Sequence, residues 1–353
     1  MGDGGGAAPK LGSTTALLGL IAGAGASYGI YKLVSGGGWR RNKKRASGGD
    51  TRGVKGGQPR EGAVQPGSLL ARVSGLDVVG GRAEGRWAAE AASDDIGSKP
   101  SGSLEPHHLN MLLSCLQTTS NPSHKCQILL TLGNAAAFTG NQDLIRELGG
   151  LHTIASFLSD PEPKVRVQTL NALNNLSMNI QNQEELKVYV SQVVELIEIS
   201  PVNSDLQLAA LRLLTNLSVT DKYQHLLKGS IKLLFSLLIV SNEALQIQAL
   251  KVLVNLSSNP DMMDDIVQTQ VPASVVLLFD IRTPLEVLLR LLTFAGNLKA
   301  WRPSAQVADE LRGKQDCLFR VLLDESPQLH SRLLQLLSHP VGEVQAQVAR
   351  FLT

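Results

Sequence analysis

Five asparagines at a regular interval are the residues best placed to do recognition chemistry. Each lies in an apolar run, and the intervals between them are 41, 41, 39 and 42 residues. A primary amide donates and accepts hydrogen bonds, so such a column can clamp the backbone of an extended partner peptide. The same side chains can equally bond a neighbouring repeat at the edge of a buried face. The candidate partner-groove residues are Asn134, Asn175, Asn216, Asn255 and Asn297.

Catalytic and metal chemistry has little support in the sequence. Histidines and cysteines cluster between residues 107 and 126, without the close CxxC spacing of a zinc site. The GAGASYG stretch at residues 23–29 has the glycines of a dinucleotide loop, but it lies inside an apolar segment with no strand before it. HExxH, GKS/T and DxDxDG patterns are absent from the sequence. We therefore expect a protein that is not an enzyme and that has no cofactor and no metal.

The elements that must position the asparagines are amphipathic helices. A period near 40 residues with helical patterning is typical of armadillo and HEAT solenoids, and the entry through Gly149 and Gly150 favours the armadillo type. The turns ahead of the helices, such as SPVNSDL at residues 200–206, are rich in capping residues. One continuous apolar face is formed by Leu206, Ala209, Ala210, Leu213, Leu214 and Leu217.

The predicted fold is all-α, an armadillo-type right-handed superhelical solenoid over residues 104–353 with five repeats and a partial sixth. We place an insertion at roughly residues 299–314, before the last unit. Nuclear-import receptors carry a tryptophan one turn before each groove asparagine, and this sequence does not. Binding of nuclear-signal peptides in that manner is therefore not expected. The corresponding residues here are Leu130, Asn171, Arg212, Lys251 and Thr293.

The N-terminal part predicts a single-pass membrane anchor. After a short tail at residues 1–10, the anchor is placed at residues 11–34. Its uncharged run of 21 residues would span about 30 Å as a helix. A cleaved signal peptide would carry its charges before the apolar run, whereas here they follow it. By the positive-inside rule they hold the C-terminal side in the cytosol. These topology and targeting residues are Arg40, Arg41, Lys43, Lys44 and Arg45.

Small residues in the anchor allow two interpretations. Their small-xxx-small spacing would let two anchors pack closely as a dimer, or it simply reflects a weakly apolar segment. The residues are Gly19, Gly23, Gly25 and Gly29. Residues 35–103, basic and then of low complexity, predict a disordered linker.

Charge is distributed unevenly along the chain. The formal net charge is +2, yet residues 40–60 carry +7 and residues 61–353 sum to −6. A nucleic-acid-binding surface on the folded domain is therefore not expected. Three cysteines without CxxC spacing fit a reducing, cytosol-facing compartment.

Specific segments carry a resemblance to a known family. They are GAGASYGIYKL, LGNAAAFTGNQDLIRELGG, LNALNNLSMNIQNQ, VYVSQV, LLTNLSVTDKYQHLL and VLVNLSSNPDMMDDIVQTQVP. These stretches resemble the family of armadillo repeat-containing protein 10 and the X-linked Alex proteins, over the anchor and nearly all of residues 104–353.

The resemblance implies an integral protein of the mitochondrial outer membrane, with the endoplasmic reticulum membrane as the alternative. It implies regulation of mitochondrial distribution and dynamics through mitochondrial Rho GTPases and kinesin trafficking adaptors, and of cell growth or survival. The alternative function is that of a soluble or endoplasmic-reticulum-associated cofactor that restrains a tumour-suppressor transcription factor.

Overall fold

The computed structural model describes residues 104–324 and 326–352. The predicted anchor with its glycines, the basic flank and the linker lie outside the described residues. Within the described residues, no helix is both long enough and apolar enough to cross a membrane.

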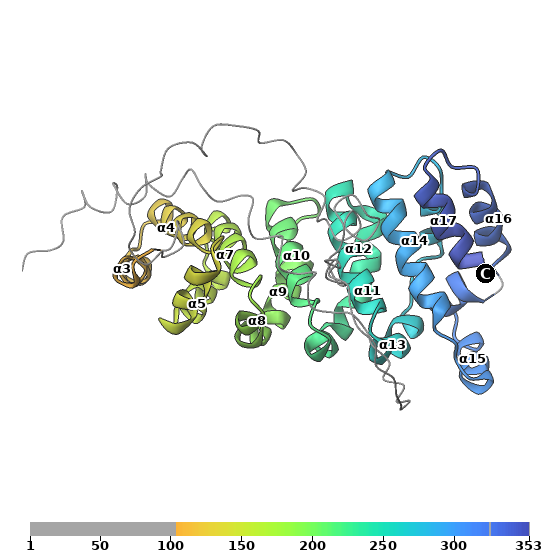
Figure 1. Ribbon diagram of the computed structural model, residues 1–353, viewed down its shortest axis with the longest axis horizontal. Helices are drawn as coiled ribbons and strands as arrows, with labels where there is room; N and C mark the ends of the chain where they lie inside the picture. The colour runs from red at the N-terminus through yellow and green to blue at the C-terminus, as the bar shows by residue number, and fades with distance from the viewer. Residues whose placement is uncertain (1–103, 325, 353) are drawn as a thin grey trace, which may run out of the picture.

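A row of long helices runs the length of the described chain (Figure 1). Each member packs against the next, from α4 to α17. We call this set the long-helix row. Its members are α4 (Pro122–Ala135), α7 (Pro163–Leu176), α10 (Asp205–Leu217), α12 (Glu243–Ser257), α14 (Leu285–Ala300) and α17 (Gly342–Leu352).

The other helices precede the row or lie between its successive members. The segments immediately before each long helix are α3 (Pro106–Thr118), α6 (Gly150–Ala155) with η3 (Ser156–Ser159), η4 (Lys187–Tyr189) with α9 (Val190–Ile199), α11 (Ile231–Val240), η7 (Ala273–Leu278) and α16 (Pro327–Leu336). The segments that follow a long helix are α5 (Thr139–Glu147), α8 (Ile180–Leu186), η5 (Asp221–Ser230), η6 (Pro260–Met262) with α13 (Met263–Gln268), and α15 (Ala305–Arg312). This order makes an all-helical armadillo-type solenoid.

The core is a continuous seam between these helices. All six residues of the apolar face predicted on α10 are buried, which confirms the helical register read from the sequence. Each such leucine contributes roughly 1.5–3 kcal/mol through burial. The helices α4 and α7 approach each other closely at Gly133. A Cβ atom added to this glycine would lie only 3.3 Å from the Cα of Ala172 on α7.

The predicted caps and turns are confirmed at the starts of the long helices. The Ser204 side chain accepts a hydrogen bond from the backbone N–H of Gln207, and Asn242 accepts one from Leu245. Such caps satisfy N–H groups that lack a partner within the helix. Gly149 adopts a left-handed conformation at φ 69° before α6, a region that glycine occupies without strain.

The predicted position of the insertion is wrong. α15 takes the place of a short helix that follows a long one, and the additional residues lie between Arg312 and Pro327 instead. They include a π-helical turn, Phe319–Leu323, and an antiparallel bridge between Gln270 and Cys317. Helical periodicity continues through residues 305–312, so sequence spacing alone placed the interruption too early.

Candidate partner-binding surface

The asparagine column links neighbouring members of the long-helix row. The Nδ2 atom of Asn175 donates to the carbonyl oxygen of Gly133 on α4 at 2.9 Å. Asn255 donates to Oγ of Ser218 at 2.9 Å. Each bond reaches back to the end of the preceding long helix, so the amide nitrogens stabilise the stacking of repeats.

Asn216 makes the densest set of these contacts. Its Nδ2 atom lies 3.0 Å from the carbonyl oxygen of Asn174 and 3.1 Å from Oγ of Ser177, and the residue is 8% exposed. Asn297 donates to Oγ of Ser257 at 3.1 Å. Asn134, at the start of the column, makes no side-chain hydrogen bond with the described residues, because the described chain has no earlier long helix for it to reach.

The amide oxygens of the column differ from one another. The oxygen of Asn175 accepts from the Asn174 side chain at 3.3 Å, and that of Asn297 accepts from Arg350 at 3.2 Å. For Asn216 and Asn255, no described residue donates to the amide oxygen, and neither oxygen is a fully buried atom. These two oxygens are therefore available to accept a hydrogen bond from a partner.

A second column, which sequence reasoning missed, lies eight residues after the asparagines. Its glutamines are Gln142, Gln183 and Gln224, spaced by 41 residues and buried. Gln183 donates to the carbonyl oxygen of Ser177 at 2.8 Å and accepts from Oγ1 of Thr220 at 2.6 Å. We call this column the glutamine seam. Its constant spacing was the signal that could have revealed it, and its buried bonds give it a structural role.

The side chains four residues before the asparagines lie on the outside of the long-helix row. Leu130 is 51% exposed, Asn171 is half-buried and Arg212 is exposed. Lys251 and Thr293 are half-buried, and the Thr293 hydroxyl donates to the carbonyl oxygen of Leu289 at 2.8 Å. Unlike the asparagines, these positions hold apolar, polar and charged side chains in different repeats. They can therefore determine which partner side chains each part of the row binds.

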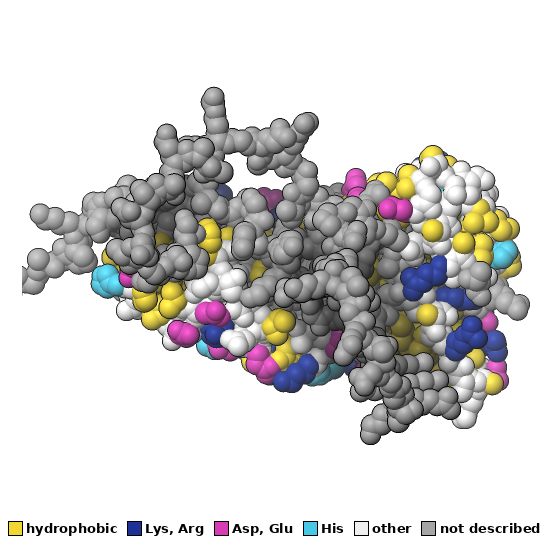
Figure 2. Space-filling view, in the orientation of Figure 1, with side chains coloured by type: hydrophobic (Ala, Val, Ile, Leu, Met, Phe, Trp, Pro, Cys, Tyr) yellow, Lys and Arg dark blue, Asp and Glu magenta, His cyan; other side chains and the backbone are white. Residues whose placement is uncertain are grey.

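Positive charge gathers on the row between α10 and α14. Burial, together with the charges of Arg290 and Arg212, lowers the pKa of Lys251 to about 8, and Glu286 opposes this effect. Arg290 is buried and forms an ion pair with Glu286 one turn earlier. Lysine and arginine side chains also gather over α14 and α15 on the face drawn in Figure 2.

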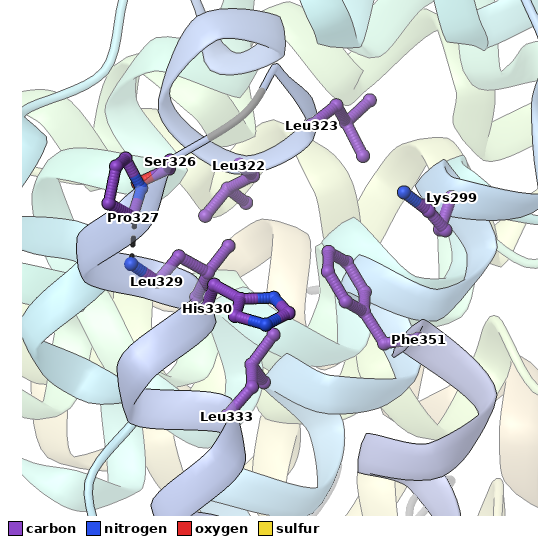
Figure 3. Close-up of a pocket in the computed structure, with 9 residues that line it drawn as sticks. All are labelled: Lys299, Leu322, Leu323, Ser326, Pro327, Leu329, His330, Leu333 and Phe351. Atoms are coloured by element: carbon purple, nitrogen blue, oxygen red, sulfur yellow. Dashed lines mark hydrogen bonds between the residues drawn. The ribbon is translucent and has the colours of Figure 1, made fainter. Parts of the chain in front are cut away.

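A cleft at the C-terminal end offers a different kind of surface. Its volume is about 360 Å³, and α16, α17 and the π-helical turn enclose it (Figure 3). Leu322, Leu329 and Leu333 give it an apolar wall. The His330 ring lies between Leu333 and Phe351 in the view of Figure 3, and Lys299 lies to one side. The Lys299 ammonium lies 5.6 Å from the centre of the Phe351 ring. Across residues 104–324 and 326–352, no group of three or more histidine, cysteine or acidic side chains is arranged to hold a metal ion.

Stacked three-helix units joined through one continuous row define a helical-repeat solenoid, a class that acts by presenting an extended surface to other proteins. The sequence model of the armadillo-like family matches residues 104–323. The chain belongs to that family.

Solved structures show the same fold. A designed armadillo repeat protein in complex with the peptide (KR)4 has a TM-score of 0.58 at 19% identity, over 69% of this chain and 98% of that chain. Designed armadillo repeat proteins for modular peptide recognition give 0.58 at 18% identity, over 69% and 98%. An engineered protein gives 0.56 at 21% identity, over 69% and 95%. At these identities the likeness shows the fold alone.

Proposed function

We propose that this chain is a non-enzymatic scaffold whose long-helix row holds an extended segment of a partner protein. The observation that carries the proposal is the pair of available amide oxygens on Asn216 and Asn255, in neighbouring repeats. An extended backbone presents N–H groups along its length, and successive carbonyl acceptors can hold it. The designed protein of the same fold that was solved with (KR)4 supports a peptide partner.

The test compares partner capture by variants of the full chain. Arg212→Trp places a bulky side chain on the row one turn before Asn216, and Ile199→Trp places the same bulk on α9, where Ile199 is 69% exposed. Proximity labelling in cells should lose partners for Arg212→Trp and keep them for Ile199→Trp. The same set of labelled proteins from both variants would contradict binding on the row.

We further propose that residues 11–34 anchor the scaffold in the mitochondrial outer membrane, with the solenoid facing the cytosol. The support is the uncharged run of 21 residues, the basic flank behind it and the family resemblance. In this role the scaffold recruits trafficking machinery, the mitochondrial Rho GTPases and kinesin adaptors of the resembling family, and thereby acts on mitochondrial distribution and on cell growth or survival. The two-anchor packing of Gly19 with Gly23 and of Gly25 with Gly29 remains part of this proposal.

Removal of residues 1–45 tests the anchor. The truncated protein should be diffuse in the cytosol by fluorescence microscopy, while the full chain surrounds mitochondria. Retention of the truncated protein on an organelle would overturn the anchor. Full-chain signal on the endoplasmic reticulum would favour that membrane, and a mature N-terminus near residue 26 by mass spectrometry would favour the soluble cofactor.

A further inference from the structure

We infer that the partner segment held between α10 and α14 is an acidic peptide, whose carboxylates pair with Arg212 and Lys251 while its backbone bonds to Asn216 and Asn255. This inference rests on the proposed function, since it names the chemistry of the segment that the long-helix row holds. We call Arg212 and Lys251 the cation pair.

Neither member of the cation pair is in a direct ion pair with the described residues, and Glu286, whose charge acts on Lys251, is already paired with Arg290. The side chains of the cation pair also make no hydrogen bond with any of the described residues. Burial and neighbouring positive charge lower the pKa of Lys251. A carboxylate arriving at this site would relieve that repulsion and form charge-assisted hydrogen bonds.

The two cations have equivalent places in successive repeats. Each lies four residues before its column asparagine, so each is followed one helical turn later by an available amide oxygen. Neighbouring helices pack about 8–10 Å apart. An extended chain advances about 3.3 Å per residue and returns a side chain to the same face at every second residue, about 6.6 Å along the chain. Two carboxylates on one face of the peptide, two residues apart and carried on flexible side chains, would therefore reach both cations, with a backbone N–H near each amide oxygen.

The charge of the rest of the domain favours a peptide over a nucleic acid. Residues 104–353 carry 19 basic and 23 acidic side chains, a net charge of −4, so the cation pair is a local exception on an acidic domain. A long polyanion would meet this negative field along its length, whereas a short acidic segment contacts only the cationic repeats. A positively charged peptide such as (KR)4, which the designed armadillo repeat protein binds, would be repelled by Arg212 and Lys251.

The experiment measures fluorescence anisotropy of a labelled peptide of about twelve residues, with glutamate at every second position so that the carboxylates share one face of the extended chain. The full chain should bind it, and Arg212→Glu and Lys251→Glu should each weaken binding at least about tenfold. Lys232→Glu on α11, an exposed lysine without an ion pair to the described residues, is the matched control and should change binding less than about twofold. A variant with residues 40–45 made neutral keeps the basic flank from contributing, and it should bind as the full chain does.

The outcomes separate the inference from the proposed function. If glutamate, lysine and neutral peptides bind equally well and all cross-link to α10 and α12, the acidic nature of the partner is wrong. The proposed function as a scaffold is unaffected by that result. Glutamate-peptide binding unaffected by Arg212→Glu and Lys251→Glu would also overturn it. So would a labelled RNA oligonucleotide that outcompetes the peptide at the cation pair. Cross-links from the acidic residues 84–95 of the same chain to α12, with no binding of added peptide, would replace the partner with an intramolecular one.

Discussion

The N-terminal and C-terminal halves of the long-helix row differ in chemistry although they share a framework. On α4 and α7 the positions one turn before the asparagines hold the exposed Leu130 and the half-buried Asn171, which carry no charge. On α10 and α12 the same positions hold Arg212 and Lys251. Since the asparagines bond the neighbouring repeat in both halves, the framework is constant and the recognition surface varies.

The glutamine seam ends one repeat after this change in charge. Gln142, Gln183 and Gln224 repeat from α5 to η5, and the next equivalent position holds Met263, which is 5% exposed. The period also changes there from 41 to 39 residues. The repeats up to η5 are therefore held together by buried amides, while those that follow rely more on apolar packing. This comparison can be tested by substitution.

The largest effect is expected from Gln183→Met. Gln183 is fully buried, and methionine would leave the carbonyl oxygen of Ser177 and the hydroxyl of Thr220 without these partners. We expect the free energy of unfolding to fall by about 2–3 kcal/mol, measured by urea denaturation followed by circular dichroism. The control is Gln168→Met on α7, a half-buried glutamine with no bond to the described residues. Equal destabilisation by both substitutions would remove the special role of the seam.

A smaller effect separates two members of the asparagine column. Asn216→Ala removes the bonds from α10 to Asn174 and Ser177, and should cost about 1–2 kcal/mol. Asn134→Ala removes no hydrogen bond to a described residue and should cost less than about 0.5 kcal/mol. The measurement is the shift in thermal midpoint of the two variants. A loss at Asn134 as large as that at Asn216 would show that the stacking bonds do not account for the column.

How far the sequence could predict this structure depends on what repeats in it. The apolar face of α10 and the asparagine column recur at nearly fixed intervals, so periodicity locates them. Which group each asparagine bonds depends on how closely one long helix approaches the next, as at Gly133. Sequence spacing alone therefore leaves two roles open for the amide, binding of a partner peptide and bonding to a neighbouring repeat. The place of the added residues after Arg312 depends on tertiary contacts such as the bridge between Gln270 and Cys317. The pattern of neighbouring residues in the sequence does not predict contacts of this kind.

Unlike the substitutions above, removal of the Lys251 charge should increase the free energy of unfolding. The pKa of Lys251 in the folded chain, about 8, lies below the ordinary value of 10.5 because of burial and the charges of Arg290 and Arg212, which outweigh Glu286. Between those two values the unfolded chain binds more protons, so this residue makes stability rise with pH across that window. Below pH 8 its charge opposes folding in full, and above 10.5 it no longer does.

Lys251→Met should therefore stabilise the protein at pH 7, by about 1–2 kcal/mol after allowance for partial exposure of the side chain. The gain should vanish above pH 10.5, where the native lysine is neutral in both states. Urea denaturation at several pH values measures the change, with Lys232→Met as a control expected to stay within about 0.5 kcal/mol throughout. The same substitution should weaken binding of the glutamate peptide.

Stabilisation together with lost binding would mean that the C-terminal half of the row keeps an unfavourable charge for recognition. A loss of stability at pH 7 would mean that this charge is compensated within the fold, and the contrast between the two halves would then lose its electrostatic basis.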